Sequence, residues 1–178
     1  NISGKFVIMY AGNFGIGQGL DYIISTASSL QYLQRLQFVF IGDGTELQKL
    51  QDIKMTEKIE NVTFIPRQPM KNIGRFLALG DILLVHLIDI PVFSTQMPSK
   101  LIAYMACAKP VLCAMKGTAP KLINDACAGV TCAPSDPVAI SSAIKQVYKM
   151  DTLELLMMGQ NARKLYENNY TRQIQVQR

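Results

Sequence analysis

A glycine-rich turn near the start of the chain is well suited to binding phosphate. Residues 5–21 read KFVIMYAGNFGIGQGLD, an apolar run followed by the glycines Gly12, Gly15, Gly17 and Gly19. Glycines let a backbone bend tightly and approach a ligand closely. A helix opening near Gly19 would point free N–H groups and the positive end of its dipole at an anion. The pattern predicts a phosphate site, although the same glycines could serve only to pack a helix on a sheet.

A second candidate anion site follows at Met97-Pro98-Ser99-Lys100. Pro98 is predicted to be the first residue of a helix, which would leave the amides of Ser99, Lys100 and Leu101 free. The Ser99 hydroxyl and the Lys100 ammonium could bond the same anion. Two such sites would suit a diphosphate. In the alternative interpretation, Pro98 and Ser99 only start a helix and Lys100 is a solvated charge.

Other residue types point to no nucleophile, general base or metal site. The turn lacks the Gly-Lys-Ser/Thr of a P-loop, and no acidic residue follows where a dinucleotide-binding fold would hold a ribose. His86 has no carboxylate partner in the sequence, which favours a packed or hydrogen-bonded histidine over a catalytic one. The cysteines lack zinc-site spacing and lie in apolar segments, so we predict buried reduced thiols; they are Cys107, Cys113, Cys127 and Cys132.

Short β-branched runs alternate with longer amphipathic ones along the chain. This alternation predicts an α/β fold, a Rossmann-like doubly wound parallel sheet of about six strands with helices on both faces. The strands are predicted at 6–10, 36–41, 62–65, 82–87, 110–114 and 129–132. The helices are predicted from residue 20 and at 45–54, 70–79, 99–107, 120–126, 137–149 and 153–168.

The predicted topology places the functional residues in loops. Ligands of doubly wound sheets bind at the carboxyl ends of the strands, where the strand order reverses. Four segments follow such ends here: 12–19, 41–44, 66–69 and 86–100. We therefore expect the site to be built from them.

Composition bounds the class of protein. The chain has 178 residues and 49% apolar content, enough for one domain with a core. The net charge of +5 is spread over single Lys and Arg residues, which argues against a nucleic-acid-binding stripe. The longest apolar runs are strand-sized and no leader pattern is present, so we expect a cytoplasmic protein.

The order of motifs resembles the C-terminal, donor-binding half of GT-B glycosyltransferases of group 1, or family 4, and covers nearly the whole chain. The matching segments are Tyr10-Ala11-Gly12-Asn13 through Gly19-Leu20-Asp21, Gly42-Asp43-Gly44, Gly80-Asp81 before an apolar strand, and Pro98-Ser99-Lys100-Leu101 through Lys109-Pro110-Val111-Leu112. Members that act in bacterial surface-polysaccharide assembly are the most similar.

The resemblance implies that residues 1–178 form a single nucleotide-sugar-binding domain, with a nucleoside-diphosphate sugar, UDP-type favoured, as substrate and no cofactor. The residues implied for the donor diphosphate are Gly12, Asn13, Phe14, Gly15, Ser99 and Lys100. Those implied for the base and ribose region are Gly42, Asp43, Pro66, Arg67, Gln68 and Ala103. The acceptor would bind a missing N-terminal domain.

The implied reaction is transfer of a glycosyl group to a hydroxyl, with retention and without a metal, in polysaccharide or glycoconjugate synthesis. The full-length protein would be cytoplasmic, at the inner face of the membrane, with peripheral membrane contact. On this reading the isolated domain is inactive, and residues 165–178 are under-packed.

The chain departs from the family at its charged positions. Two glutamates usual in the family correspond to Thr95 and Ala103, and the second would hold the ribose hydroxyls. Its loss could cost about 1–3 kcal/mol of donor binding. Asn13, Ile16 and Gln18 occupy the positions of the usual basic residues, so Lys100 is the obvious countercharge. Two alternatives stay open: a degenerate, non-catalytic partner or regulatory subunit, and a GT-B epimerase, which should supply catalytic carboxylates and a histidine.

Overall fold

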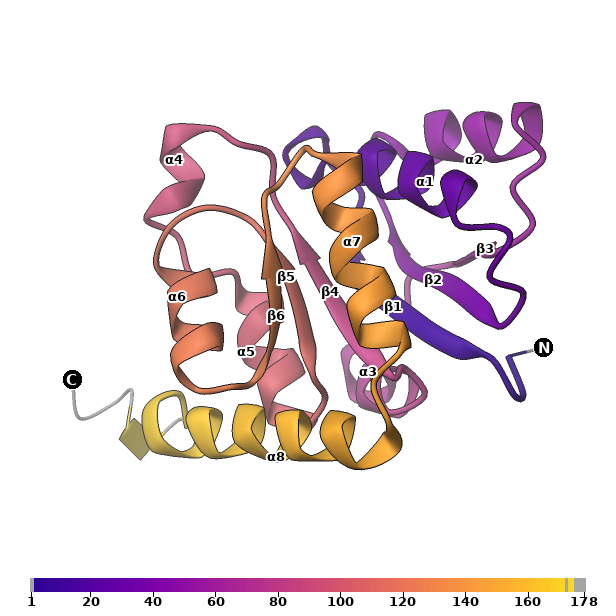
Figure 1. Cartoon of the computed structure of the whole chain (residues 1–178). Coiled ribbons are helices and arrows are strands. Elements are labelled where there is room, and N and C mark those ends of the chain that lie inside the picture. The colour runs from indigo at the N-terminus through magenta and orange to yellow at the C-terminus, as the bar shows by residue number, and fades with distance from the viewer. Residues whose placement is uncertain (1, 172, 175–178) are drawn as a thin grey trace.

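The protein is a six-stranded parallel sheet with helices on both faces, as seen in a computed structural model that describes residues 2–171, 173 and 174 (Figure 1). The strand order is β3-β2-β1-β4-β5-β6, so the order reverses between β1 and β4. This confirms the predicted doubly wound sheet. The strands are β1 (Phe6–Asn13), β2 (Leu36–Asp43), β3 (Val62–Ile65), β4 (Ile82–His86), β5 (Val111–Ala114) and β6 (Gly129–Cys132).

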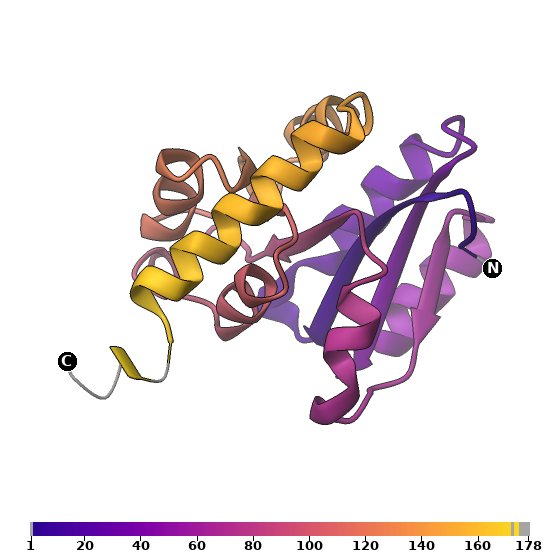
Figure 2. The ribbon, with the colours of Figure 1, turned by 90° about the horizontal axis from the view of Figure 1, so that it is seen from below.

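Helices cover each face of the sheet and bury a separate apolar cluster (Figures 1 and 2). One face carries α1 (Leu20–Ser29), α2 (Leu47–Thr56) and α7 (Pro137–Tyr148). The other carries α3 (Met70–Leu77), α5 (Ser99–Ala106), α6 (Thr118–Asp125) and α8 (Thr152–Asn169). Two short elements were not predicted: a 3-10 helix, η1 (Ile16–Gln18), and α4 (Pro91–Ser94).

Alternation along the central strand explains why both faces need a helical cover. In β1, Ile8 and Tyr10 enter one cluster, whereas Val7 and Met9 enter the other, and all four are at most 2% exposed. A strand that is apolar on both faces is typical of a parallel sheet buried between helices. The apolar runs in the sequence therefore predicted the core correctly.

The aspartate that precedes β4 has a structural role at the amino end of the sheet. The Asp81 carboxylate accepts a hydrogen bond from the Val7 amide at 2.7 Å, and the Val7 carbonyl accepts one from the Asp81 amide at 2.9 Å. This pair of bonds fixes the register at which β1 and β4 begin to run together.

Both strands that lead to the candidate site run further than predicted. β1 reaches Asn13 and β2 reaches Asp43, with Gly12 opposite Gly42 in the parallel register. A Cβ atom on Gly42 would lie 1.9 Å from the Gly12 carbonyl oxygen. Glycine at position 42 is therefore what lets β1 and β2 stay paired beyond the predicted ends.

The cysteines are less uniformly buried than predicted. Cys113 is buried, Cys107 and Cys132 are half-buried, and Cys127 is exposed, so the prediction of four buried thiols is wrong for three of them. Burial raises the pKa of the Cys113 thiol to about 12 and that of Cys132 to about 11. Both thiols stay protonated near neutral pH and are poor nucleophiles.

The end of α8 is better packed than the sequence suggested. Leu165, Tyr166 and Tyr170 pack against the core cluster on the α5 face, which contradicts the expectation of an under-packed segment for these residues. Arg172 and residues 175–178 of that predicted tail lie outside the described residues. None of the helices described here is long and apolar enough to span a membrane.

Candidate anion-binding site at the switch point of the sheet

A cavity of about 700 Å³ opens at the carboxyl edge of the sheet, beside the point where the strand order reverses. It is bounded by the ends of β1 and β2, the loop after β3, one side of α3 and the first turns of α5. The described residues lining it are Ala11, Gly12, Asn13, Gln18, Ile41, Gly42, Asp43, Arg67, Gln68, Met70, Ile73, Leu77, Ser99, Lys100, Ala103 and Tyr104. Its position agrees with the general rule for doubly wound sheets.

Tyr104 closes the gap where β1 and β4 separate. The two strands pair only at Ile8 with Ile82 and Met9 with Leu83, so the backbone of Ala11 cannot reach a partner on β4. The Tyr104 hydroxyl takes that place: it accepts from the Ala11 amide at 2.8 Å and donates to the Ala11 carbonyl at 3.1 Å. Burial raises the pKa of Tyr104, so the phenol stays neutral and keeps both bonds.

Lys100 brings a positive charge to the wall of the cavity. Its Nζ donates to the Tyr10 hydroxyl at 2.5 Å and to Oε1 of Gln18, and lies 4.0 Å from the centroid of the Tyr10 ring. Burial lowers the pKa of Lys100 to about 7. The ammonium is therefore partly deprotonated near neutral pH in the free protein, and an anion that enters the cavity would favour its charged form.

Gly12 leaves room for this lysine. A Cβ atom at position 12 would lie 3.2 Å from Lys100 Nζ and 3.3 Å from the Tyr10 hydroxyl. Any side chain larger than hydrogen would therefore press on the ammonium and on its phenol partner. The first glycine of the turn thus serves the site directly.

Most of the predicted site residues come together at the cavity. From the diphosphate set, Gly12, Asn13, Ser99 and Lys100 line it, and from the base and ribose set, Gly42, Asp43, Arg67, Gln68 and Ala103 do so. Ala103 follows Lys100 by three residues, so the two share a face of α5. Thr95, the other position that lacks the family's glutamate, is exposed at the end of α4 and is not among the lining residues.

Three predicted residues lie elsewhere. Phe14 is fully buried in the core, and its amide donates to the Asp43 carbonyl at 2.8 Å, so neither group is free for a ligand. Gly15 packs against the Asn13 side chain rather than lining the cavity. Pro66 is exposed, and its carbonyl accepts from the Gln68 side chain at 2.8 Å.

The later glycines of the turn pack the chain rather than face an anion. Gly17 lies beneath the Phe93 ring, where a Cβ atom would be 2.7 Å from Cζ. Gly19, the N-cap of α1, is buried against His86 and Ile88, and its amide donates to the Ile16 carbonyl. The packing interpretation holds for these two positions, and none of residues 19–22 is among the described residues that line the cavity.

The start of α5 also differs from the prediction. Pro98 has an extended ψ of 128° and is the N-cap, so the helix begins at Ser99. The Leu101 amide donates to the Pro98 carbonyl at 2.9 Å, which closes the first turn and removes this amide from the set available to a ligand. The side chains of Ser99 and Lys100 still reach the cavity.

His86 is a structural residue, as the sequence favoured. The ring is fully buried, Nδ1 lies 2.6 Å from the Gln18 carbonyl, and Nε2 accepts from the Ser135 amide at 3.0 Å. These partners require the proton on Nδ1 and a neutral ring. Burial lowers the pKa of His86 in agreement with that state.

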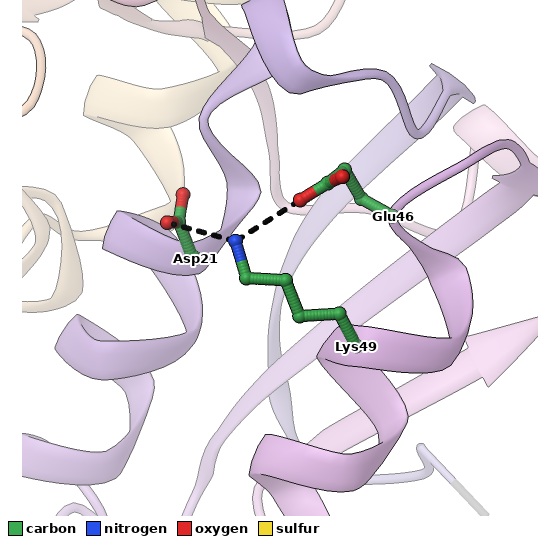
Figure 3. Close-up of polar contacts among 3 residues, drawn as sticks. All are labelled: Asp21, Glu46 and Lys49. Atoms are coloured by element: carbon green, nitrogen blue, oxygen red, sulfur yellow. Dashed lines mark hydrogen bonds and ion pairs between the residues drawn. The ribbon is translucent and has the colours of Figure 1, made fainter.

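A surface ion-pair group joins the helices that follow β1 and β2. Lys49 on α2 lies 3.0 Å from the Glu46 carboxylate and 3.5 Å from that of Asp21 at the start of α1 (Figure 3). Lys49 is exposed and is not among the lining residues. Its ion pairs are with Glu46 and Asp21. The cations of the described lining are Lys100 and Arg67.

Sequence reasoning missed the apolar wall and the tyrosine partners of the site. Met70, Ile73 and Leu77 recur at helical spacing on α3 and line the cavity together. The same spacing, counted from Lys100 on α5, would have indicated Tyr104 as its neighbour. Tyr10 gave no local signal, because a tyrosine in an apolar strand resembles any other core residue.

Residues 1–165 match the family model described as glycosyl transferases group 1. The probable glycosyltransferase WbjE of Pseudomonas aeruginosa is 31% identical over 179 aligned positions, covering 98% of this chain and 43% of that protein. The putative colanic acid biosynthesis glycosyl transferase WcaI of Escherichia coli (strain K12) is 32% identical over 81 positions, or 46% of this chain and 20% of that protein. The chain thus spans less than half the length of either relative.

Solved structures share the fold. Anabaena Alr3699/HepE in complex with UDP superposes with a TM-score of 0.84 and 17% identity, over 99% of this chain and 48% of that one. At such low identity the likeness concerns the fold alone. It agrees with the observed strand order and helical layers.

Proposed function

Because the chain belongs to the group 1 glycosyl transferases, we propose that it is the C-terminal, donor-binding half of such an enzyme. The observation that carries this proposal is the cavity at the switch point, which combines two cations, Lys100 and Arg67, with an apolar wall on α3. Cations suit a diphosphate, and an apolar wall suits the flat face of a base.

In the proposed complex the diphosphate lies against Gly12, Asn13, Ser99 and Lys100. The base and ribose lie between the end of β2 and the loop after β3, against Met70 and Ile73 on α3. We favour a UDP-sugar as donor. The UDP complex of HepE, a protein of the same fold, supports this choice.

The proposed reaction transfers the glycosyl group to a hydroxyl with retention at the anomeric carbon and without a bound metal. As the bond to the sugar lengthens, negative charge builds on the leaving diphosphate. Lys100 would stabilise that charge more than the charge of the ground state. The acceptor would bind an N-terminal half of a longer protein, so the 178-residue chain alone should bind the donor without transferring sugar.

The proposed setting is surface-polysaccharide or glycoconjugate synthesis in the cytoplasm, at the inner face of the membrane. The naming of WcaI for colanic acid biosynthesis supports it. A peripheral membrane contact of the full-length protein belongs to the same proposal.

A second candidate is a non-catalytic relative that serves as a partner or regulatory subunit. It is favoured by Ala103, an exposed alanine on the cavity wall where the family usually has a ribose-binding carboxylate. An epimerase is less well supported, because the described lining includes one carboxylate, Asp43, and no histidine.

Titration calorimetry with UDP, GDP and ADP tests the proposal, with uridine and pyrophosphate as fragments of the ligand. We expect one nucleotide to bind more tightly than its nucleoside. Ala103→Glu should strengthen UDP binding about tenfold, or about 1.4 kcal/mol, without strengthening pyrophosphate binding. The matched control is Ala78→Glu, at the exposed C-cap of α3, which is not among the described lining residues. Donor binding by this chain would be refuted if none of the three nucleotides binds more tightly than uridine, either to the wild type or to Ala103→Glu.

A further inference from the structure

The ammonium of Lys100 is held more tightly than an exposed lysine would be. Two of its three N–H donors are engaged by Gln18 Oε1 and the Tyr10 hydroxyl, and the Tyr10 ring lies beneath it. The Tyr10 hydroxyl lies 2.7 Å from the main-chain carbonyl oxygen of Asn13 and 2.9 Å from Gln18 Oε1, so its single O–H can donate to either oxygen. The third N–H of Lys100 has no acceptor among the described residues, and the side chain lines the cavity.

The backbone of Gln18 is held by a buried histidine. The main-chain carbonyl oxygen of Gln18 lies 2.6 Å from Nδ1 of His86, and the next residue, Gly19, is buried against the same ring. The side chain of Gln18 therefore extends from an anchored backbone toward Lys100, across 82 residues of sequence. A glutamine held in this way can place an ammonium without adding charge to the site.

We propose that Gln18 is a positioning residue which, together with Tyr10, fixes the Lys100 ammonium over Gly12 with its third N–H directed to the diphosphate of the donor. This inference rests on the proposed function and adds to it the device that places the countercharge. Gln18 supplies a neutral acceptor, so the positive charge of Lys100 is not cancelled by a carboxylate and stays available to the ligand.

Above pH 7, the change of charge at the site that we expect to affect anion binding is the deprotonation of Lys100. Burial raises the pKa of Tyr10 and of Tyr104, so both phenols stay neutral. Burial lowers the pKa of His86, behind Gln18, so the imidazole is neutral as well. The other charged side chains of the described lining are Arg67, in the loop after β3, and Asp43, at the end of β2. Burial lowers the pKa of Lys100 itself to about 7.

Anion binding should therefore take up a proton at alkaline pH. In the free protein at pH 8, about nine in ten Lys100 side chains are neutral, and a bound diphosphate restores the ammonium. Affinity should then fall by up to about tenfold per pH unit above pH 7. Below pH 7 the lysine is already charged, and this dependence should disappear.

The experiment combines two measurements on the chain. NMR titration of the lysine Cε and Hε resonances gives the protonation midpoint of Lys100, whose signal is assigned by its loss in Lys100→Arg. Calorimetry from pH 7.5 to 9 measures pyrophosphate binding, with buffers of different ionisation enthalpy to count protons. The variants are Gln18→Ala and Gln18→Glu, and the matched control is Gln146→Ala at an exposed position of α7.

Loss of the acceptor in Gln18→Ala should lower the Lys100 midpoint by roughly half to one pH unit and weaken pyrophosphate about three- to tenfold at pH 8. Gln18→Glu should raise the midpoint and remove the pH dependence, yet still weaken pyrophosphate by repulsion. Gln146→Ala should change neither.

The proposal is overturned if the protonation midpoint of Lys100 is the same in Gln18→Ala as in the control Gln146→Ala. It is overturned as well if Gln18→Ala strengthens pyrophosphate binding, because Gln18 would then compete with the anion for the ammonium. It is also overturned if the wild type binds no pyrophosphate. Pyrophosphate binding that responds to Gln18, without tighter binding of any nucleotide, would instead refute the proposed function and keep the positioning role.

Discussion

Removing one oxygen atom, in Tyr104→Phe, should destabilise the protein far more than its size suggests. The phenyl ring would keep its packing, because Tyr104 is 1% exposed among core residues of the α5 face. The change removes only the hydroxyl that bonds both backbone groups of Ala11. Those groups cannot turn to β4, which has already separated from β1 at this level.

The expected loss of stability follows from the two backbone groups of Ala11, its N–H and its C=O, which lose their hydrogen-bond partner. A buried backbone N–H or C=O left without a partner costs about 1–3 kcal/mol, and Ala11 is 7% exposed, so water can relieve part of the loss. We expect a decrease of about 2–4 kcal/mol in the free energy of unfolding. For a chain of this length that corresponds to a fall in Tm of about 5–15 °C.

Urea unfolding followed by circular dichroism measures the difference, with Tyr32→Phe at an exposed tyrosine as the control. The slope of the transition should be unchanged, because the same surface is exposed on unfolding. A loss below about 0.5 kcal/mol, within the range of ordinary surface substitutions, would mean that the strand ends at the switch point do not depend on this hydroxyl.

Further predictions concern backbone crowding, surface charge and pH. Gly42→Ala should cost about 3 kcal/mol or more, or prevent folding, because its Cβ would lie 1.9 Å from the Gly12 carbonyl oxygen; soluble yield and Tm test this, and a Tm equal to that of the wild type would contradict it. Lys49→Ala should lower the free energy of unfolding by less than about 1 kcal/mol, and the difference should vanish in high salt, since the ion pairs of Lys49 are exposed (Figure 3). A larger loss of stability that does not depend on salt would contradict this prediction. His86 has a lowered pKa when folded, so its neutral form stabilises the native state above the unfolded pKa, and stability should fall as pH drops below about 6.5; His86→Gln should be less stable at pH 7 but should lose that part of the slope, as urea unfolding at several pH values would detect. Lys100 also has a lowered pKa, so folding should become more favourable as pH rises from about 7 toward the unfolded lysine pKa; Lys100→Met should flatten this rise relative to Lys164→Met, and parallel curves for the two variants would refute the assignment.

The architecture could be predicted from local patterns. Six apolar runs separated by amphipathic segments specify buried parallel strands covered on both faces, since such strands need helices above and below. The same patterns located the cavity, because segments 12–19, 41–44 and 66–69 follow consecutive strands whose carboxyl ends meet at one edge. Lys100, predicted as an anion-binding residue from its place just after Pro98-Ser99, lines the cavity.

The assignment of individual residues within those segments could not be predicted. Phe14 and Gly15 share a turn with Gly12 and Asn13, yet only the latter pair lines the cavity. The difference depends on which side of the chain faces β2 and α2, where the Phe14 amide and carbonyl bond the Asp43 carbonyl and the Glu46 amide. Glycines at 17 and 19 fit either a ligand or a neighbouring side chain, and only their packing against Phe93, His86 and Ile88 decides between these uses.

The sequence by itself therefore determined the six strands, the longer helices and the edge of the sheet at which the cavity opens, because each depends on neighbours within a few residues. Only the tertiary structure decided how the charge of the site is held. Tyr10 and Gln18 lie 90 and 82 residues from Lys100 along the chain. They meet it because β1 and α5 flank the point where the strand order reverses, and burial among these groups is what brings the pKa of Lys100 to about 7. No local pattern specifies such a contact, since it arises only when distant segments pack against the same part of the sheet.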